Sequence, residues 1–212
     1  MKYRVKKTMI NLERNNIIAY YVETKEEVLK LTKMILTEGE TVSCGGSVSL
    51  DETGVKELLA SGKYNFLDRS KARNSAETEE IYRKTFSCDT FLTSANAITE
   101  WGELINVDGN GNRIAAITYG PKMVLFIVGV NKIVADSNEG FMRIKTTAAP
   151  LNVKRLEKET PCAKTGVCVA TDLPLGAGCG SCDRICSSYL VTAYQRTRGR
   201  VRVILCGEDI GY

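Results

Sequence analysis

Apolar positions in the first part of the chain recur with the periods of helices and of strands in turn. Between residues 24 and 36 they return at helical spacing, and Thr24 stands three residues before Glu27, the arrangement of a capping box at a helix start. The continuous apolar run at 17–22 predicts a short buried strand. The same reasoning predicts a helix over 5–16, a strand over 40–43, and a strand, a Gly-Gly-Ser turn and a helix over 44–59.

The middle of the chain is richer in expected strands. The run MVLFIVG at 123–129 is apolar throughout, which is typical of a central strand covered on both faces. Asp-Gly-Asn-Gly at 108–111 is a strong turn signal and is expected to join two strands. Pro150 is expected to break a helix over 137–155. The other expected elements are strands over 88–99, 102–108, 112–120 and 201–207, a short strand or turn over 64–68, and helices over 77–86 and 187–195.

The order of these elements predicts the fold class. Helices and strands alternate in the N-terminal half, hairpins dominate the centre, and a helix and a strand follow. This order is typical of an α/β fold with an open sheet, mixed and not purely parallel, and with helices on both faces. Because neither repeats nor linkers divide the 212 residues, we expect a single domain over 1–212, with a cysteine-rich insertion at 161–186.

Composition and charge exclude several classes of protein. Hydrophobic residues make up 43% of the chain and charged residues 25%, which are ordinary values for a soluble globular protein. The net charge of +4 is spread along the chain, without the clustering of a nucleic-acid-binding surface. No apolar stretch has the length of a signal peptide or of a membrane span. We therefore expect a cytoplasmic protein with neither a membrane nor a nucleic acid as partner.

Histidine is absent from the sequence. Catalytic triads that use histidine, metal sites ligated by histidine and the commonest general base are all excluded as a result. Any catalysis has to use carboxylates, thiolates, lysine, hydroxyl groups or a bound cofactor.

The segment 161–186 holds five of the 8 cysteines, among glycines that let the backbone bend. Clustered cysteines in a cytoplasmic protein bind metal or carry out redox chemistry more often than they form disulfides. Four thiolates satisfy either an iron–sulfur cluster or a tetrahedral zinc ion, and unligated or redox-active thiols are the third interpretation. The C-x2-C-x3-C spacing is part of a ferredoxin-type run, whereas a zinc ribbon has two C-x2-C pairs. The five residues are Cys162, Cys168, Cys179, Cys182 and Cys186.

Polar side chains at the ends of expected strands form a second candidate site, because open α/β sheets bind ligands there. Glu100 is the candidate acid, base or nucleophile if a pocket raises its pKa or positions it, and a solvated turn residue otherwise. The Gly45-Gly46-Ser47 turn either lets backbone N–H groups approach an anion or is simply a tight turn. The other candidates for binding a phosphate or carboxylate are Asn96, Thr99, Asn112, Arg113 and Lys132.

Several segments resemble the lactate-utilisation domain (LUD) family, also called DUF162. They are GGSVSL (45–50), residues 93–134, PCAKTG (161–166), DRIC (183–186) and GEDIGY (207–212). The resemblance spans nearly the whole chain in order. It implies a fold like that of ribose-5-phosphate isomerase, glucosamine-6-phosphate deaminase and the CoA transferases, and a link to the oxidation of lactate to pyruvate.

The family's cysteine pattern ranks the five thiols. Cys162, Cys168 and Cys186 match it directly, and the interval after Cys168 is longer here. Cys179 is then the expected third ligand in chain order, although it and Cys182 can exchange roles. Thr99-Glu100-Trp-Gly also loosely resembles the Glu-x-Gly of CoA transferases, in which the glutamate is the nucleophile.

Three hypotheses follow. In the first, the protein assists the oxidation of lactate or a similar 2-hydroxy acid through a cysteine-bound iron–sulfur cluster (4Fe–4S) or metal, beside partner electron-transfer subunits. In the second, it is an enzyme acting on a phosphorylated or CoA-linked small carboxylate, with Glu100 as acid/base or nucleophile. In the third, it is a binding module with a structural zinc site. A homodimer is compatible with each of them.

Overall fold

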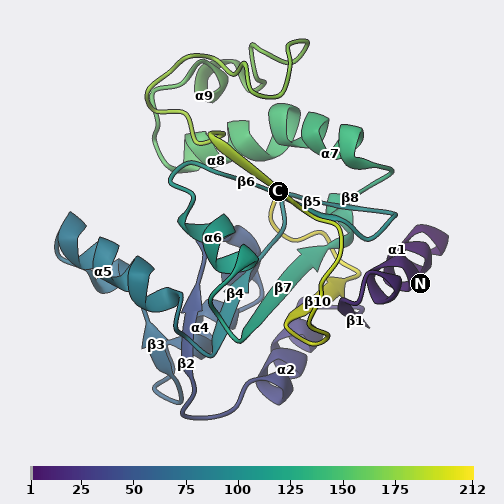
Figure 1. The fold of residues 1–212 in the computed structure, drawn as a ribbon, viewed down its shortest axis with the longest axis vertical. Coiled ribbons are helices and arrows are strands. Elements are labelled where there is room, and N and C mark those ends of the chain that lie inside the picture. Colours follow the sequence, from purple (N-terminus) through teal and green to yellow (C-terminus); the bar gives the residue numbers. More distant parts are fainter. Residues whose placement is uncertain (1) are drawn as a thin grey trace.

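Six parallel strands form the larger of two sheets in the computed structural model, which describes residues 2–212 (Figure 1). β7 lies inside this sheet, as its apolar sequence predicts, and pairs with β10 on one side and β4 on the other. In spatial order the strands are β1 (Ile18–Val22), β10 (Val201–Cys206), β7 (Met123–Gly129), β4 (Thr90–Thr93), β2 (Thr41–Cys44) and β3 (Asn65–Leu67).

Helices cover both faces of the larger sheet and bury its alternate side chains in two clusters. Helices α1 (Tyr3–Arg14) and α6 (Asn112–Thr118) pack on one face, against side chains such as Phe126 of β7. The opposite face, which carries Ile127, is covered by α2 (Lys25–Ile35), α3 (Val48–Glu52) and α4 (Val55–Leu59). Helix α5 (Ser75–Thr85) lies near β3, at the edge of the sheet. None of the helices in residues 2–212 has the length and apolar character needed to cross a bilayer.

The start of α2 shows how closely local sequence sets a boundary. The Thr24 side chain accepts a hydrogen bond from the Glu27 backbone at 3.3 Å, and the Glu27 carboxylate accepts one from the Thr24 backbone at 3.4 Å. The predicted capping box is confirmed. It satisfies two of the N–H groups that a helix start leaves without partners.

A smaller, four-stranded sheet lies beside the first. Beyond it lie α7 (Ser137–Arg143), α8 (Ala149–Arg155) and α9 (Pro161–Thr165) (Figure 1). Its strands, in order, are β8 (Ile133–Val134), β5 (Ala97–Thr99), β6 (Leu104–Asp108) and β9 (Ser188–Thr192). Pairing is antiparallel except between β5 and β8. The predicted α/β class, with an open sheet and helices on both faces, is confirmed. The larger sheet is purely parallel, and the mixed pairing is confined to the smaller one.

Two segments adopt the opposite secondary structure to the one expected. Residues 112–120 were expected to be a strand, but α6 occupies most of them, and the adjacent Ala116 and Ile117 are both buried, which no strand facing one layer would allow. Residues 187–195 were expected to be a helix, but they contain β9, which pairs with the whole of β6. The Tyr, Val and Thr residues of β9 are good strand formers, so strand propensity was the better guide there.

Two turn expectations also need correction. The Asp-Gly-Asn-Gly sequence joins β6 to α6 and not to a further strand, and Gly111 adopts a φ of +81° just before the helix. Pro150 does not break the helical segment. A π-helical turn, η3 (Ile144–Ala148), links α7 (Ser137–Arg143) to α8 (Ala149–Arg155), and Pro150 lies in the first turn of α8, where its missing N–H costs no hydrogen bond.

Candidate functional site

A cavity of about 440 Å³ lies where carboxyl ends of the parallel strands face β6 and α8. Residues that follow β2, β4 and β7 form one side of it, and residues at the end of β6 and on α8 form the other. This is the edge at which open α/β sheets bind ligands. Its volume is in the range of small-molecule sites. The cavity therefore has the position and the size of a ligand pocket.

The lining is strongly basic. Five basic side chains face one acidic side chain: Arg69, Arg113, Lys132, Arg155 and Lys158, with Asp108. A cavity with this imbalance concentrates anions, because each unneutralised charge attracts a counter-ion. The pocket is suited to a carboxylate or a phosphate and unsuited to a cation.

Lys132 is the most deeply buried of these charges, with 2% of its surface exposed. A short 3-10 helix after β7, η2 (Val130–Lys132), carries it, and its Nζ donates to Ser49 Oγ at 2.9 Å and Ser94 Oγ at 3.1 Å. No carboxylate in residues 2–212 forms an ion pair with it. Burial, and then the nearby Arg143 and Arg113, lower the pKa of Lys132 from 10.5 to about 7. The amine is therefore close to half protonated at neutral pH.

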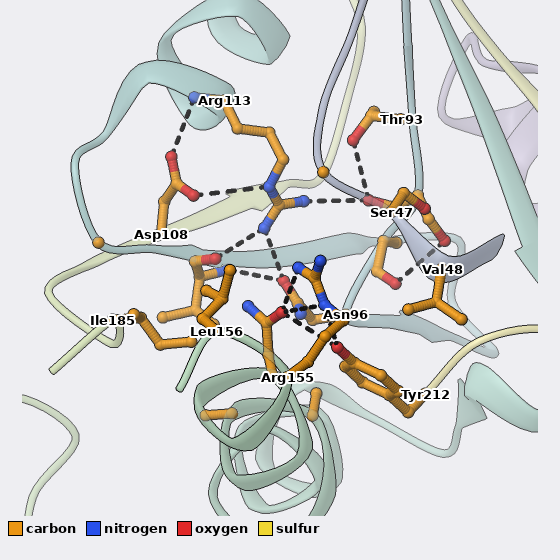
Figure 2. Close-up of a pocket in the computed structure, with 18 of the residues that line it drawn as sticks. Ser47, Val48, Thr93, Asn96, Asp108, Arg113, Arg155, Leu156, Ile185 and Tyr212 are labelled. Atoms are coloured by element: carbon orange, nitrogen blue, oxygen red, sulfur yellow. Dashed lines mark hydrogen bonds and ion pairs between the residues drawn. The ribbon is translucent and has the colours of Figure 1, made fainter. Parts of the chain in front are cut away.

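Arg113 lines the pocket but has its donors occupied by the protein. Its guanidinium donates to the Asn96 side chain at 2.9 Å (Figure 2) and to the Asn106 side chain at 2.8 Å. It also donates to the Ser94 and Val107 carbonyls at 3.0 and 2.6 Å. The Nε atom lies 3.6 Å from an oxygen of Asp108. Arg113 therefore ties the end of β4 to β6 and shapes the pocket, leaving little hydrogen-bonding capacity for a ligand.

Two other arginines, Arg69 and Arg155, line the pocket without a carboxylate partner in the described part of the chain. The Arg69 guanidinium donates to the Tyr82 hydroxyl at 3.2 Å and lies over its ring. Arg155 Nε donates to the Tyr212 hydroxyl at 2.9 Å, and these two side chains lie close together in Figure 2. The sequence analysis did not single out either arginine. Arg69 follows β3 at a strand end, and that position was the signal available.

Most of the predicted binding residues meet at this cavity. Gly46, Ser47, Asn96 and Asn112 line it together with Arg113 and Lys132. Gly45 lies behind the lining, where a Cβ would come within 3.0 Å of Arg113. Thr99 is buried elsewhere, and its hydroxyl donates to the Glu103 carboxylate at 3.1 Å.

Glu100 is not among the residues that line the pocket. Its carboxylate accepts hydrogen bonds from Lys7 at 2.8 Å and Arg4 at 2.6 Å, both on α1. The hydrogen bond from Lys7 is the largest cause that lowers the pKa of Glu100 below its usual value, and the one from Arg4 adds to it. Burial raises the pKa by less than the Lys7 hydrogen bond lowers it. Neither condition expected of an acid, base or nucleophile is met, because the pKa of Glu100 is not raised and no pocket residue positions it. A catalytic role for Glu100 stays a prediction that this geometry does not support.

The cysteine-rich segment 161–186 begins with the short helix α9 (Pro161–Thr165) and lies beyond α8 (Figure 1). All eight cysteines of the chain are free thiols. Burial raises the pKa of Cys162, a hydrogen bond with Thr160 lowers it, and the neighbouring thiols of Cys168, Cys179 and Cys186 raise it further. Cys182 is exposed and is not among these neighbours. Cys168, Cys179 and Cys186 are thus within electrostatic range of Cys162.

The chemistry of the donor set fits a thiolate-bound metal or cluster, because soft sulfur ligands bind iron and zinc. The segment also holds an orphaned donor, since Arg184 Nε is buried without a hydrogen-bond partner. A buried cationic donor of this kind compensates the negative charge of a thiolate-ligated centre. Within residues 2–212, however, no three Cys, Asp or Glu side chains stand close enough together to hold a metal ion. The thiols are therefore not at ligating distance from one another.

The pocket and the thiols are neighbours along the chain. Ile185 lines the pocket and is followed directly by Cys186. Leu156 lies beside Ile185 on one side of the pocket, with Tyr212 on the other (Figure 2). A ligand bound in the pocket would therefore lie close to the cysteine-rich segment.

A profile of the LUD domain matches residues 5–206, almost the entire chain. The chain belongs to the LUD domain family. A DUF162 family protein from Deinococcus radiodurans, whose crystal structure is known, has 14% sequence identity and a TM-score of 0.51, with 96% of this chain and 94% of that chain covered. At this identity the likeness concerns the fold alone.

A second solved structure, a malonate decarboxylase alpha subunit from Acinetobacter baumannii, also has 14% identity. It covers 64% of the LUD chain but only 34% of its own, with a TM-score of 0.35. A search of curated proteins found no match. The residues of the pocket therefore have to be interpreted from their own geometry.

Proposed function

We propose that this protein assists the oxidation of lactate or a similar small 2-hydroxy acid, using a 4Fe–4S cluster held by four cysteines. The ligands are Cys162, Cys168, Cys179 and Cys186. The observation that carries the proposal is that Cys168, Cys179 and Cys186 lie within electrostatic range of Cys162, and that Cys186 directly follows Ile185 of the pocket lining. Membership of the LUD family, which is associated with lactate utilisation, supports the choice of substrate.

The pocket residues suit a 2-hydroxy acid. The basic lining attracts the carboxylate, and Lys132 Nζ donates to it while Ser49 and Ser94 hold the amine in place. In the fraction of molecules in which Lys132 is neutral, its lone pair accepts the proton of the 2-hydroxyl group. When bound, the cluster supplies one-electron transfer. As the acid becomes a 2-oxo acid, the C2–H bond breaks and its hydrogen leaves with the bonding electron pair. A hydride-accepting partner electron-transfer subunit takes this hydride and passes on its two electrons.

Anaerobic purification followed by iron and sulfide analysis tests the cluster. We expect about four irons and four sulfides for each chain, as a cubane cluster requires. Cys179→Ser is expected to lose most of the iron, whereas Cys182→Ser, a matched change only three residues away, is expected to retain it. A colourless protein without iron contradicts the proposal.

Zinc is the second candidate for the same thiols, because four thiolates also satisfy a tetrahedral zinc ion. One zinc for each chain without iron, together with unfolding of the segment on chelation, is the result that distinguishes a structural zinc site from a cluster. Equal iron loss in Cys182→Ser and Cys179→Ser contradicts the ligand assignment but not the cluster itself.

A further inference from the structure

The pocket has room for a larger ligand than lactate. Its volume of about 440 Å³ corresponds to on the order of fifteen waters at about 30 Å³ each. A molecule of lactate's size would displace only a minority of them. Lactate also carries one negative charge, whereas five basic side chains line the cavity against a single carboxylate. Both the volume and the charge therefore point to a second anionic group on the ligand.

The two free arginines converge on one point of the lining. A Cβ built on Gly46 would lie 2.5 Å from Arg69 Nη2 and 3.7 Å from Arg155 Nη2. The two nitrogens are therefore within about 6 Å of each other, with a glycine that leaves the space between them open. One anion can contact both, because charge-assisted N–H···O distances are about 2.7–2.9 Å and a phosphate presents several oxygens.

Nothing in the described chain neutralises this pair. Neither arginine forms an ion pair among residues 2–212, in contrast to Lys158, whose Nζ lies 3.7 Å from Asp183. Neutral partners fix the guanidinium groups instead: Tyr82 for Arg69, and Asn152 with Tyr212 for Arg155. Like charges held this close repel each other unless a counter-ion lies between them. The arrangement is that of a binding site for a multiply charged anion.

We propose that Gly46, Arg69 and Arg155 form a phosphate subsite within the pocket, so that the ligand is a phosphorylated small carboxylic acid. A phosphate monoester carries about −1.5 to −2 charges and three acceptor oxygens at neutral pH, which matches two guanidinium groups. A carboxylate offers one charge and two oxygens, and leaves one guanidinium unneutralised.

The second group of the ligand binds at Lys132, in the same cavity. Gly46 lies just before α3, and Ser49 of that helix holds Lys132 Nζ at 2.9 Å. Because Gly46, Arg69, Arg155 and Lys132 all line one pocket, a single ligand with two anionic groups can contact both ends. The inference rests on the proposed function in one respect, namely that the carboxylate of the acid binds at Lys132.

Calorimetric titration with two matched compounds tests the subsite: glycerate, a 2-hydroxy acid, and 3-phosphoglycerate, the same acid with a phosphate. We expect 3-phosphoglycerate to bind at least about tenfold more tightly, the effect of one or more charge-assisted hydrogen bonds. Arg69→Gln and Arg155→Gln should each weaken its binding by about tenfold to a hundredfold and leave glycerate binding unchanged. Inorganic phosphate should compete with 3-phosphoglycerate and not with glycerate.

Two further variants separate loss of the subsite from loss of the fold. Gly46→Ala keeps both arginines and places a methyl group between them, so it should weaken only the phosphorylated ligand. Arg73→Gln is the matched control, because Arg73 is 86% exposed and paired with Glu77 on the surface, and it should change neither affinity.

Equal binding of the two acids by the wild-type protein would overturn the subsite, as would variants that weaken both acids alike. Iron and sulfide are measured on the same preparation. Full iron content without a preference for the phosphorylated acid refutes the subsite alone, whereas a preference without iron refutes the cluster and leaves the subsite in place.

Discussion

Replacing Lys132 by methionine should stabilise the protein at neutral pH, although it removes two hydrogen bonds. Burial lowers the pKa of this lysine from 10.5 to about 7, so the unfolded chain binds a proton there more tightly than the folded one. At pH 7 this difference costs the folded state about 4 kcal/mol. The lost hydrogen bonds to Ser49 and Ser94 are worth about 1 kcal/mol each. Lys132→Met should therefore be more stable than wild type by about 2 kcal/mol.

The pH dependence of this difference is more informative than its size. As pH rises from 7 to 10.5 the unfolded chain loses its advantage in proton binding, so wild type gains up to about 1.4 kcal/mol per pH unit relative to the variant. We expect the two to be equally stable near about pH 9, with wild type more stable above it. Urea unfolding at pH 7, 8, 9 and 10 measures the difference, and Lys6→Met, on the exposed part of α1, controls for the substitution itself. A difference that does not change with pH refutes a lysine that titrates near neutrality.

Three other substitutions test the site and its supports. Glu100→Gln should leave the calorimetric binding of glycerate unchanged. It should cost at most about 1 kcal/mol in stability, since it removes only the partly exposed contacts with Arg4 and Lys7. A loss of glycerate binding would show that Glu100 takes part in the site. Arg113→Lys should lower the free energy of unfolding by about 3 kcal/mol, because a single ammonium cannot replace the guanidinium donors that join β4 to β6. An unchanged urea midpoint would contradict that role. Gly102→Ala should lower the free energy of unfolding by about 3 kcal/mol, and with it the melting temperature. Gly102 has a φ of +78°, and an added Cβ would lie 2.6 Å from the backbone of Asn11. A melting temperature equal to that of wild type would show that α1 can move away.

Sequence reasoning succeeded where local chemistry decides the structure. The capping box at Thr24 and the apolar run of β7 depend on short-range spacing and on burial, and both are confirmed. It failed for α6, because the apolar residues of this short segment fit both the helical and the strand period. The division of the strands between two sheets could not be predicted, because β5 pairs with β8 and β6 pairs with β9, which lie far along the chain.

Part of the pocket could be predicted, because several of its residues follow strands that are visible in the sequence. The Gly-Gly-Ser turn, Asn96, Asn112, Arg113 and Lys132 stand at or near expected strand ends, and the rule that ligands bind there was sufficient to find them. Arg155 was missed because nothing local distinguishes it from other basic residues, and for Arg69 the only local signal was its position after β3. Their significance comes from lacking an acidic partner, which is a property of the folded chain. Arg113 was predicted to bind an anion, but its guanidinium donors already form hydrogen bonds within the protein.

The pairing of β1 with β10 has a consequence for synthesis of the protein. β10 lies between β1 and β7, so the N-terminal strand has no neighbour in the larger sheet until residues 201–206 have been made. At about 5–20 residues per second, that delay is about 10 to 40 s on the ribosome. During this time the clusters around Leu12 and Val28 lack the residues of β10, such as Val203 on one face and Ile204 on the other. The larger sheet and both of its clusters are therefore completed only when β10 is inserted between β1 and β7.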